Sequence, residues 1–189
     1  RPLALLQPAH AAGGIGGRED AVKVVSLGAD RIMVDAMVWD SPQALEAIAR
    51  DLGTQAVIAH LPARMGEDGL NALDYRDRVE RPIASWLEQL PLEWVSELMV
   101  TDWSHEGSPG GFDERLLTVA QLLDKPLLCF GGISEAVQLQ RVLTHLTVVA
   151  AGVGNFLNYQ EHAVQTLKKQ LGSRAIRPPH YEVGCCLHP

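Results

Sequence analysis

A short apolar run that ends in two glycines constrains the fold of this chain more than any other feature. Residues 125–134 are KPLLCFGGIS, so an expected buried strand over Pro126–Phe130 leads directly into Gly131-Gly132 and then into a segment with helical spacing. Glycines let a backbone approach a ligand closely, and the first N–H groups of a helix attract an anion. The stretch therefore predicts an anion-binding turn between a strand and a helix.

The same arrangement occurs near the start of the chain, at Gly13-Gly14. A second strand-like run follows each glycine pair at nearly the same distance, Arg31–Asp35 in the first case and Leu146–Gly152 in the second. Repetition of a glycine turn, a helix and a strand is typical of a structure built from two similar halves. Two ordinary βα units would give the same pattern, so both interpretations stay open.

Composition limits the classes of protein that remain. The chain has 189 residues, 47% of them hydrophobic, and can bury a core as one domain. Its net charge of −7 argues against a nucleic-acid binder, which needs a basic face. With no bilayer-length apolar run and no signal-peptide pattern, we expect a cytoplasmic protein without membrane contact. The three cysteines are too few for a disulfide framework, which agrees with a reducing compartment.

Strand-like and helix-like segments alternate along the chain. The expected strands are Pro2–Gln7, Asp30–Val34, Gln55–Leu61, Trp94–Thr101, Pro126–Phe130 and Leu146–Gly152. The expected helices are Arg18–Leu27, Ser41–Leu52, Tyr75–Leu90, Phe112–Leu123, Glu135–Leu143 and Tyr159–Leu171, with loops at Ala63–Asn71 and Asp102–Gly111. About six β-α units predict an α/β fold with a parallel sheet. A doubly wound sheet needs no more units than these, whereas a closed barrel needs eight.

Several short motifs occur in a characteristic order over about residues 2–157. They are GGI followed by ED and GADR, then AMVWDSP, GTQAV, SELMVTD, EGSPGGFD and PLLCFGG. This series resembles the HisF family, the cyclase subunit of imidazole glycerol phosphate synthase. The resemblance implies a TIM (β/α)₈ barrel of the HisF and HisA type, here as about six β-α units in one domain over residues 1–189, with an irregular tail over 172–189. It makes Pro2–Gln7 the third barrel strand, so strands one and two are expected in roughly sixty preceding residues.

The resemblance also implies a function in histidine biosynthesis. The family's cyclase receives ammonia through its barrel from a glutaminase (HisH-like) partner, and cleaves and cyclises a bis-phosphorylated ribonucleotide as a lyase. Each half-barrel holds one phosphate. The matching phosphate-binding positions are Gly14 and Asp35 in the first half, and Glu106, Gly107, Gly131, Gly132, Ala151 and Gly152 in the second. No metal or other cofactor is expected.

The acid–base residues differ from the family pattern. The family uses two aspartates, and the position that matches the one on strand five is Pro62, which has no acid–base function. Asp102, His105 and Glu106 follow the carboxyl end of an expected strand, where barrels build their sites, so we predict that they replace this chemistry. A plain polar loop is the alternative. The family has Asn where Asp35 stands, and a carboxylate there repels a phosphate unless it is offset.

Two further expectations concern the interior of the barrel. Arg31 and Glu97 match residues of the family's ammonia gate, and the alternative is an ordinary ion pair at the bottom of a barrel. His60 is expected to face the barrel or its mouth, where a structural role is the simpler interpretation. Cys185, Cys186 and His188 lack a fourth ligand, so they do not predict a metal site.

Three functions fit the sequence. The first is a HisF-like barrel that uses ammonia to make a phosphorylated product. The second is an accessory barrel that delivers ammonia to a sugar amidotransferase in surface polysaccharide biosynthesis, because residues 154–181 are similar to divergent relatives from such pathways. The third is another phosphate-binding α/β enzyme.

Overall fold

Among the residues that the structure describes, six parallel strands follow one another in space in chain order. The computed structural model describes residues 10–12, 15–35, 37–74, 77–85, 90–154 and 163–172, and its sheet has the order β1-β2-β3-β6-β7-β8. These strands are β1 (His10–Ala12), β2 (Arg31–Val34), β3 (Val57–Gly66), β6 (Glu97–Asp102), β7 (Leu127–Phe130) and β8 (Val148–Ala151). A doubly wound sheet reverses its order at a switch point, and this one does not. The order is that of a (β/α) barrel. The predicted α/β barrel class is therefore confirmed, and the alternative of a doubly wound sheet does not fit the described strands.

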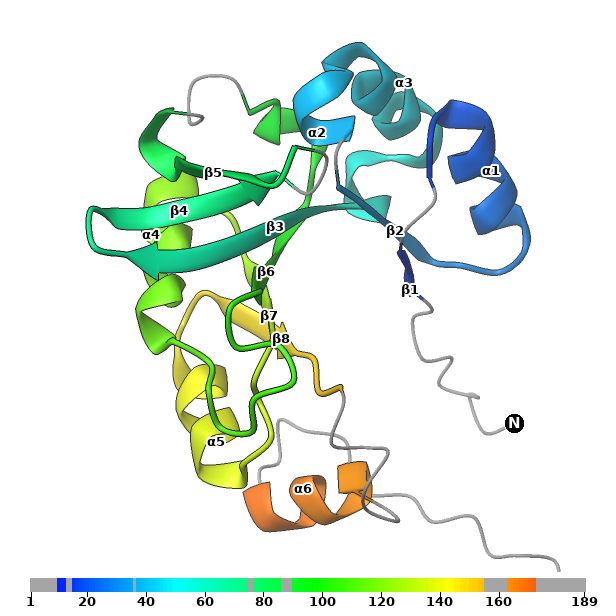
Figure 1. The fold of residues 1–189 in the computed structure, drawn as a ribbon. Helices are drawn as coiled ribbons and strands as arrows, with labels where there is room; N and C mark the ends of the chain where they lie inside the picture. The colour runs from blue at the N-terminus through cyan, green and yellow to red at the C-terminus, as the bar shows by residue number, and fades with distance from the viewer. Residues whose placement is uncertain are drawn as a thin grey trace, which may run out of the picture.

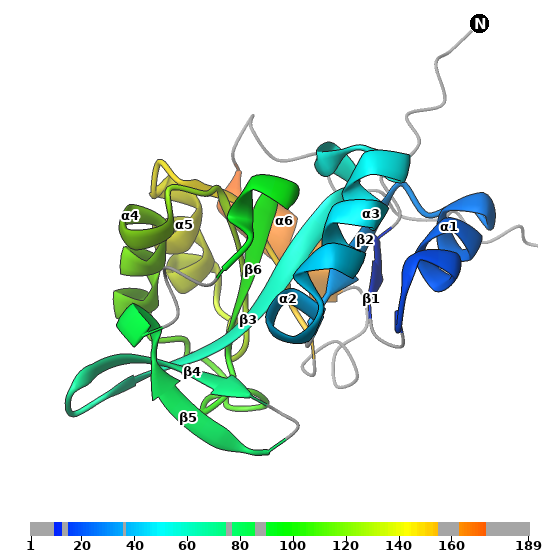
Figure 2. The same cartoon turned by 90° about the horizontal axis from the view of Figure 1, so that it is seen from above.

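The strands form a curved arc with helices along its outer side (Figures 1 and 2). The helices are α1 (Arg18–Ser26), α2 (Met37–Asp40), α3 (Pro42–Leu52), α4 (Val119–Leu123), α5 (Ala136–Thr144) and α6 (Ala163–Leu171). Short 3₁₀ turns occupy Thr54–Ala56, Ile83–Ser85, Leu92–Trp94 and Glu114–Thr118. Between β1 and β8 the described residues form no ladder, so within them the arc is open.

The two faces of the sheet differ in character because side chains alternate along each strand. The helix-packed core contains Ile32, Val34, Ala59, Leu61, Leu98, Val100, Leu127 and Cys129. The alternate positions of the same strands form the inner face of the arc: Arg31, Met33, Ile58, His60, Glu97, Met99, Thr101, Leu128 and Phe130. The core therefore lies between sheet and helices, whereas the inner face carries charged and polar side chains among its apolar ones.

Local signals explain α3 well. Ser41 precedes Pro42, whose fixed φ suits the first helical position, and Gly53 follows the last residue with φ of +84°. Leu45, Ile48 and Ala49 face the core at helical spacing. The predicted helix over Ser41–Leu52 is confirmed.

The segment after His60 was predicted wrongly. Instead of a loop over Ala63–Asn71, β3 continues to Gly66, turns through two residues and returns as β4 (Gly69–Asp74). Instead of a helix over Tyr75–Leu90, the described residues form β5 (Val79–Pro82), antiparallel to β4, and the 3₁₀ turn. Two glycines at a two-residue turn suit a hairpin, and Pro82 is tolerated because β5 pairs only with β4 among the described strands. The hairpin projects beyond the arc (Figure 2).

Other expectations have mixed outcomes. The helix over Phe112–Leu123 is wrong in its first half, which is a loop and a 3₁₀ turn before α4. The strand Pro2–Gln7, the turn Gly13-Gly14 and the tail from residue 173 lie outside the described residues, so the internal repeat and the irregular tail stay predictions. In the described ranges, no helix has the length and apolarity needed to span a membrane.

Candidate functional site

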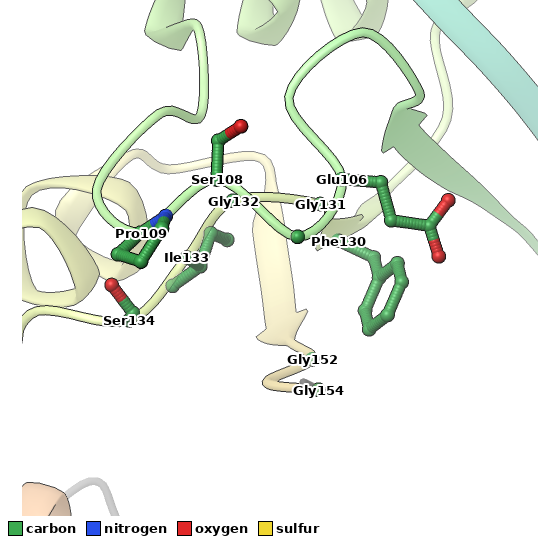
Figure 3. A pocket seen from close by; sticks show the side chains of 11 residues that line it. Glu106, Ser108, Pro109, Phe130, Gly131, Gly132, Ile133, Ser134, Gly152 and Gly154 are labelled. Atoms are coloured by element: carbon green, nitrogen blue, oxygen red, sulfur yellow. The ribbon is translucent and has the colours of Figure 1, made fainter. Parts of the chain in front are cut away.

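A pocket of about 240 Å³ lies at the carboxyl ends of β7 and β8. Its walls are residues 106–109 from the loop after β6, residues 130–134 from the turn after β7, and Gly152 and Gly154 after β8. Figure 3 shows the carboxylate of Glu106 beside the ring of Phe130 at one side and Ser134 at the other. The pocket brings together Glu106, Gly107, Gly131, Gly132 and Gly152, five of the residues singled out from the sequence.

Glycine is required at the turn after β7. Gly131 and Gly132 have φ of +95° and +73°, in the left-handed region. A Cβ on Gly131 would lie 2.5 Å from the carbonyl oxygen of Asp102, and one on Gly132 would lie 2.7 Å from the backbone nitrogen of Phe112. The turn can therefore pass directly beneath the loop after β6 only without side chains.

The backbone amides of this turn suit an anion. Within the described part of the chain, the N–H groups of Gly132, Ile133 and Ser134 donate to no protein acceptor, and they precede the nine-residue helix α5. Successive amides at the start of a helix form an anion-binding concavity. The N–H of Gly152 instead donates to the carbonyl of Cys129 at 2.7 Å, so this glycine contributes space rather than a donor.

Asp102 organises the loop above the pocket. It is fully buried, and its Oδ1 accepts from the Ser104 hydroxyl at 2.8 Å and from the His105 amide at 3.3 Å. Its Oδ2 accepts from the Asp113 amide at 2.9 Å and lies 2.8 Å from Nδ1 of His105. The carboxylate thus ties both ends of the loop together, and the structure places its oxygens against the loop rather than toward the pocket.

The loop is also fastened to the β7–α5 unit. The Ser134 hydroxyl accepts from the Gly110 amide at 2.9 Å, and the buried Gln138 donates to the Gly110 carbonyl at 2.9 Å. The imidazole of His105 is held at Nδ1 by Asp102, and its side chain is 45% exposed. Glu106 is exposed at the pocket wall. Of the three predicted acid–base residues, His105 and Glu106 are accessible to a ligand.

One ion pair near the loop shifts the pKa of a carboxyl group. Asp113 accepts hydrogen bonds from the guanidinium of Arg115, which lower the pKa of the Asp113 carboxyl, and the charge of His105 adds to this effect. Beneath the pocket, burial raises the pKa of Cys129 to about 12, so its thiol stays protonated. No cluster of three or more metal-ligating side chains occurs among the described residues.

The inner face has a charged pair at its amino end. Arg31 opens β2 and Glu97 opens β6, and their side chains form an ion pair across β3. They are 27% and 15% exposed, respectively. The structure thus brings together the two residues expected at an ammonia gate. Pro62, on the same face, pairs in register with Thr101 of β6.

Asp35 and His60, which the sequence analysis considered separately, lie next to each other in the structure. Asp35 Oδ2 is 3.4 Å from His60 Nδ1. The carboxylate that was expected to repel a phosphate therefore lies against an imidazole. Gly14 lies outside the described residues, so the structure does not test the first-half phosphate site.

Comparisons with known proteins agree with this architecture. A sequence profile for the family "Histidine biosynthesis protein" matches residues 5–163. The chain belongs to this family. Its members are TIM barrels, and this chain is a HisF-like member with the strand order described above.

Individual relatives point the same way. Over 168 residues, the chain is 26% identical to imidazole glycerol phosphate synthase subunit HisF of Bacillus cereus. The match covers 87% of this chain and 67% of that protein. The same subunit from Bacillus pumilus is 23% identical, with coverage of 90% and 69%, and that from Streptococcus mutans is 24% identical, with coverage of 89% and 69%. At such identities the relatives establish kinship, and the chemistry has to be argued from the site.

Proposed function

We propose that this chain is a HisF-like barrel that binds a phosphorylated small molecule and uses or conducts ammonia from a glutaminase partner. The observation that carries the proposal is the pocket after β7, where the amides of Gly132, Ile133 and Ser134 precede α5. Phosphate sites of TIM barrels are commonly formed by the loops after the last two strands and the start of a short helix. The HisF relatives are subunits of imidazole glycerol phosphate synthase, which supports the choice of substrate class.

Binding of inorganic phosphate, measured by calorimetry, tests the pocket. Ser134→Asp adds a negative charge to the wall while its carboxylate can still accept from the Gly110 amide, as the hydroxyl does now. Two like charges about 5 Å apart repel by about 1–3 kcal/mol, so the Kd for phosphate should rise roughly five- to hundredfold. Ser85→Asp, at an exposed serine outside the pocket, is the matched control and should bind as the wild type does. Equal Kd values for Ser134→Asp and Ser85→Asp would reject the phosphate site.

The ion pair of Arg31 and Glu97 supports the ammonia part of the proposal. It stands at the amino ends of β2 and β6, opposite the pocket end of the strands. Turnover of the bis-phosphorylated ribonucleotide with glutamine and a HisH-like glutaminase, compared with turnover with ammonium alone, tests this role. Neutralising the pair should lower only the glutamine-dependent rate. An equal effect on both rates would leave the pair as an ordinary structural contact.

Pro62 favours a second candidate function. This residue matches the strand-five aspartate of the cyclases and has no group that exchanges protons. A barrel that only delivers ammonia to another enzyme, such as a sugar amidotransferase, would need the interior but not the cyclase chemistry. This alternative predicts activation of the glutaminase without formation of an imidazole product from the ribonucleotide and ammonium.

A further inference from the structure

Three polar side chains meet on the inner face of the sheet, near the carboxyl ends of adjacent strands. Asp35 directly follows β2, His60 lies in β3 and Thr101 lies in β6, and β3 pairs with both neighbours. Nδ1 of His60 is 3.4 Å from Oδ2 of Asp35, and Nε2 is 2.9 Å from the Thr101 hydroxyl. Both ring nitrogens are therefore held, one by a carboxylate and the other by a hydroxyl. We call these residues the inner trio.

Apolar residues stand next to the inner trio on the same face. Two positions earlier on the three strands are Met33, Ile58 and Met99, and the neighbouring strand β7 presents Leu128 and Phe130. Polar groups in an apolar layer lose their contact with water, which costs free energy, and their hydrogen bonds only compensate for that cost. Apolar residues of similar size would stabilise this layer at least as well. Stability alone does not explain why a carboxylate, an imidazole and a hydroxyl are aligned here.

The exposed fraction of the residues decreases from Asp35 to His60 and then to Thr101. The side chain of Asp35 is 42% exposed, that of His60 is 18% exposed, and Thr101 as a residue is only 4% exposed. Asp35 has access to water and nevertheless lies against the ring. The imidazole is thus oriented from its open side by a carboxylate, while its other nitrogen is fixed by a buried hydroxyl. This arrangement favours the tautomer in which Nδ1 carries the hydrogen and Nε2 accepts a hydrogen bond from the Thr101 hydroxyl.

We infer that His60 is the proton-exchanging residue of this barrel's carboxyl face, with Asp35 as its positioning residue and the Thr101 hydroxyl as the group that passes the proton to it. The inference rests on the proposed function, because the molecule that exchanges the proton is the phosphorylated substrate. Imidazole is the side chain best suited to give and take protons near neutral pH. His60 would thereby supply, from the same strand, the acid–base function that Pro62 lacks.

The proton transfer is balanced within the site. The Thr101 hydroxyl gives its proton to Nε2, and its oxygen takes a proton from an N–H or O–H group of the substrate, so the proton reaches the imidazole through Thr101. The imidazolium keeps its Nδ1–H directed at Asp35, whose negative charge stabilises the cation. A proton then returns through Thr101 to the atom of the substrate that gains it, so no net proton is consumed.

Other charged groups of the surrounding strands are paired elsewhere. On β2 and β6, Arg31 and Glu97 pair with each other at the amino ends. Beyond His60 on β3, Arg64 pairs with Glu80 of the hairpin. The inner positions of β7 that the structure describes are apolar. Among the described charged groups of these strands, Asp35 is the one that the structure places against the imidazole.

The test combines turnover with nuclear magnetic resonance of the full chain. With the bis-phosphorylated ribonucleotide and ammonium, His60→Asn should lower kcat by about a hundredfold or more, since positioned acid–base groups typically contribute that much. Asp35→Asn and Thr101→Val are nearly isosteric and should lower kcat about tenfold or more while KM stays within about twofold. The Kd for inorganic phosphate should not change in His60→Asn or Thr101→Val.

A matched control comes from the same chain. Nδ1 of His145 lies 2.8 Å from the Thr147 hydroxyl in the turn between α5 and β8, and among the described residues His145 forms no ion pair with a carboxylate. His145→Asn removes a partly buried His–Thr pair just as His60→Asn does, and should leave kcat unchanged. If His60→Asn keeps kcat within twofold of the wild type, or if His145→Asn loses as much, the inference is overturned.

Failure of the proposed function would be visible separately. If the wild type shows no turnover, the Nδ1 proton of His60 is followed while the ribonucleotide is added. The proton should resonate at low field in the wild type, vanish in Asp35→Asn, and move when the ribonucleotide binds. A resonance that does not move, or one that Asp35→Asn leaves in place, refutes the role of His60, whereas loss of phosphate binding refutes the pocket.

Discussion

Asp102 offers the sharpest test of how the loop above the pocket is held. Its buried carboxylate accepts from Ser104, from both the amide and the ring of His105, and from the Asp113 amide. Asparagine has the same shape but one acceptor oxygen fewer. If its oxygen stays on the Ser104 side, the Asp113 amide loses its acceptor. If the amide group flips, the His105 amide loses its side-chain acceptor and keeps only the backbone carbonyl of Asp102, at 3.3 Å. Asparagine therefore weakens the hydrogen bonding of one backbone N–H in either orientation.

The magnitude follows from that count. The flipped orientation leaves no backbone donor wholly without an acceptor, so we expect Asp102→Asn to destabilise folding by about 1 kcal/mol, the net worth of one hydrogen bond. For a chain of this size the corresponding decrease in Tm is about 2–4 °C. Asp102→Ala loses all four contacts, and because water can replace those of the exposed Ser104 and of the His105 ring, we expect about 2–3 kcal/mol.

Urea unfolding measures these differences. Asp77→Asn is the control, because Asp77 also accepts a backbone bond, from Val79 at 2.9 Å, but its side chain is 44% exposed and water can take its place. This control should cost under about 0.5 kcal/mol. If Asp102→Asn is no more destabilising than Asp77→Asn, the carboxylate does not hold the loop. A stable Asp102→Asn variant that has lost turnover would instead favour direct chemistry by Asp102.

Three further predictions concern charges and the buried thiol. A double-mutant cycle with Arg31→Met and Glu97→Gln should give a coupling free energy of about 1 kcal/mol in urea unfolding, because the pair is largely shielded; a value near zero would contradict this. Arg115→Gln should reduce stability at neutral pH. That difference should disappear as the pH falls below 3.8, because the lowered pKa of Asp113 stabilises the fold only while the carboxyl is ionised. In a variant with both C-terminal cysteines replaced by serine, Cys129, with its pKa raised to about 12, should react with a thiol reagent at pH 8 only after unfolding.

The parts of the fold that were predictable depend on local signals. The helix that begins after Ser41 and ends before Gly53 has its start and stop encoded within the segment. The β3–β4 hairpin has no such independence. Gly66, Gly69 and the charged turn between them resemble a loop when considered alone, and only the pairing of β4 with both β3 and β5 makes them a sheet. The structure of that segment was therefore determined by long-range strand pairing and not by its local composition.

The same division applies to the site. Gly131 and Gly132 were found from sequence because a glycine pair after a strand is a local pattern. The role of Asp102 was not accessible, because it depends on the Asp113 amide, which only the folded loop brings to it. The contact of Asp35 with His60 depends on the pairing of β2 with β3, since helices α2 and α3 separate the two residues in the chain.

The two ends of the inner face suggest how the proposed functions connect. At the amino end, Arg31 and Glu97 form a charged pair, and beyond them Met33, Ile58 and Met99 form an apolar layer. Neutral ammonia crosses such a layer more easily than ammonium, because stripping water from an ion is costly. His60 is the first residue beyond this layer on β3 that can exchange a proton. If ammonia enters from the amino end, it therefore meets an imidazole at the point where its reaction with a substrate requires protons to be moved. The decrease in kcat caused by His60→Asn should then disappear when ammonium is replaced by a nucleophile that has no proton to lose.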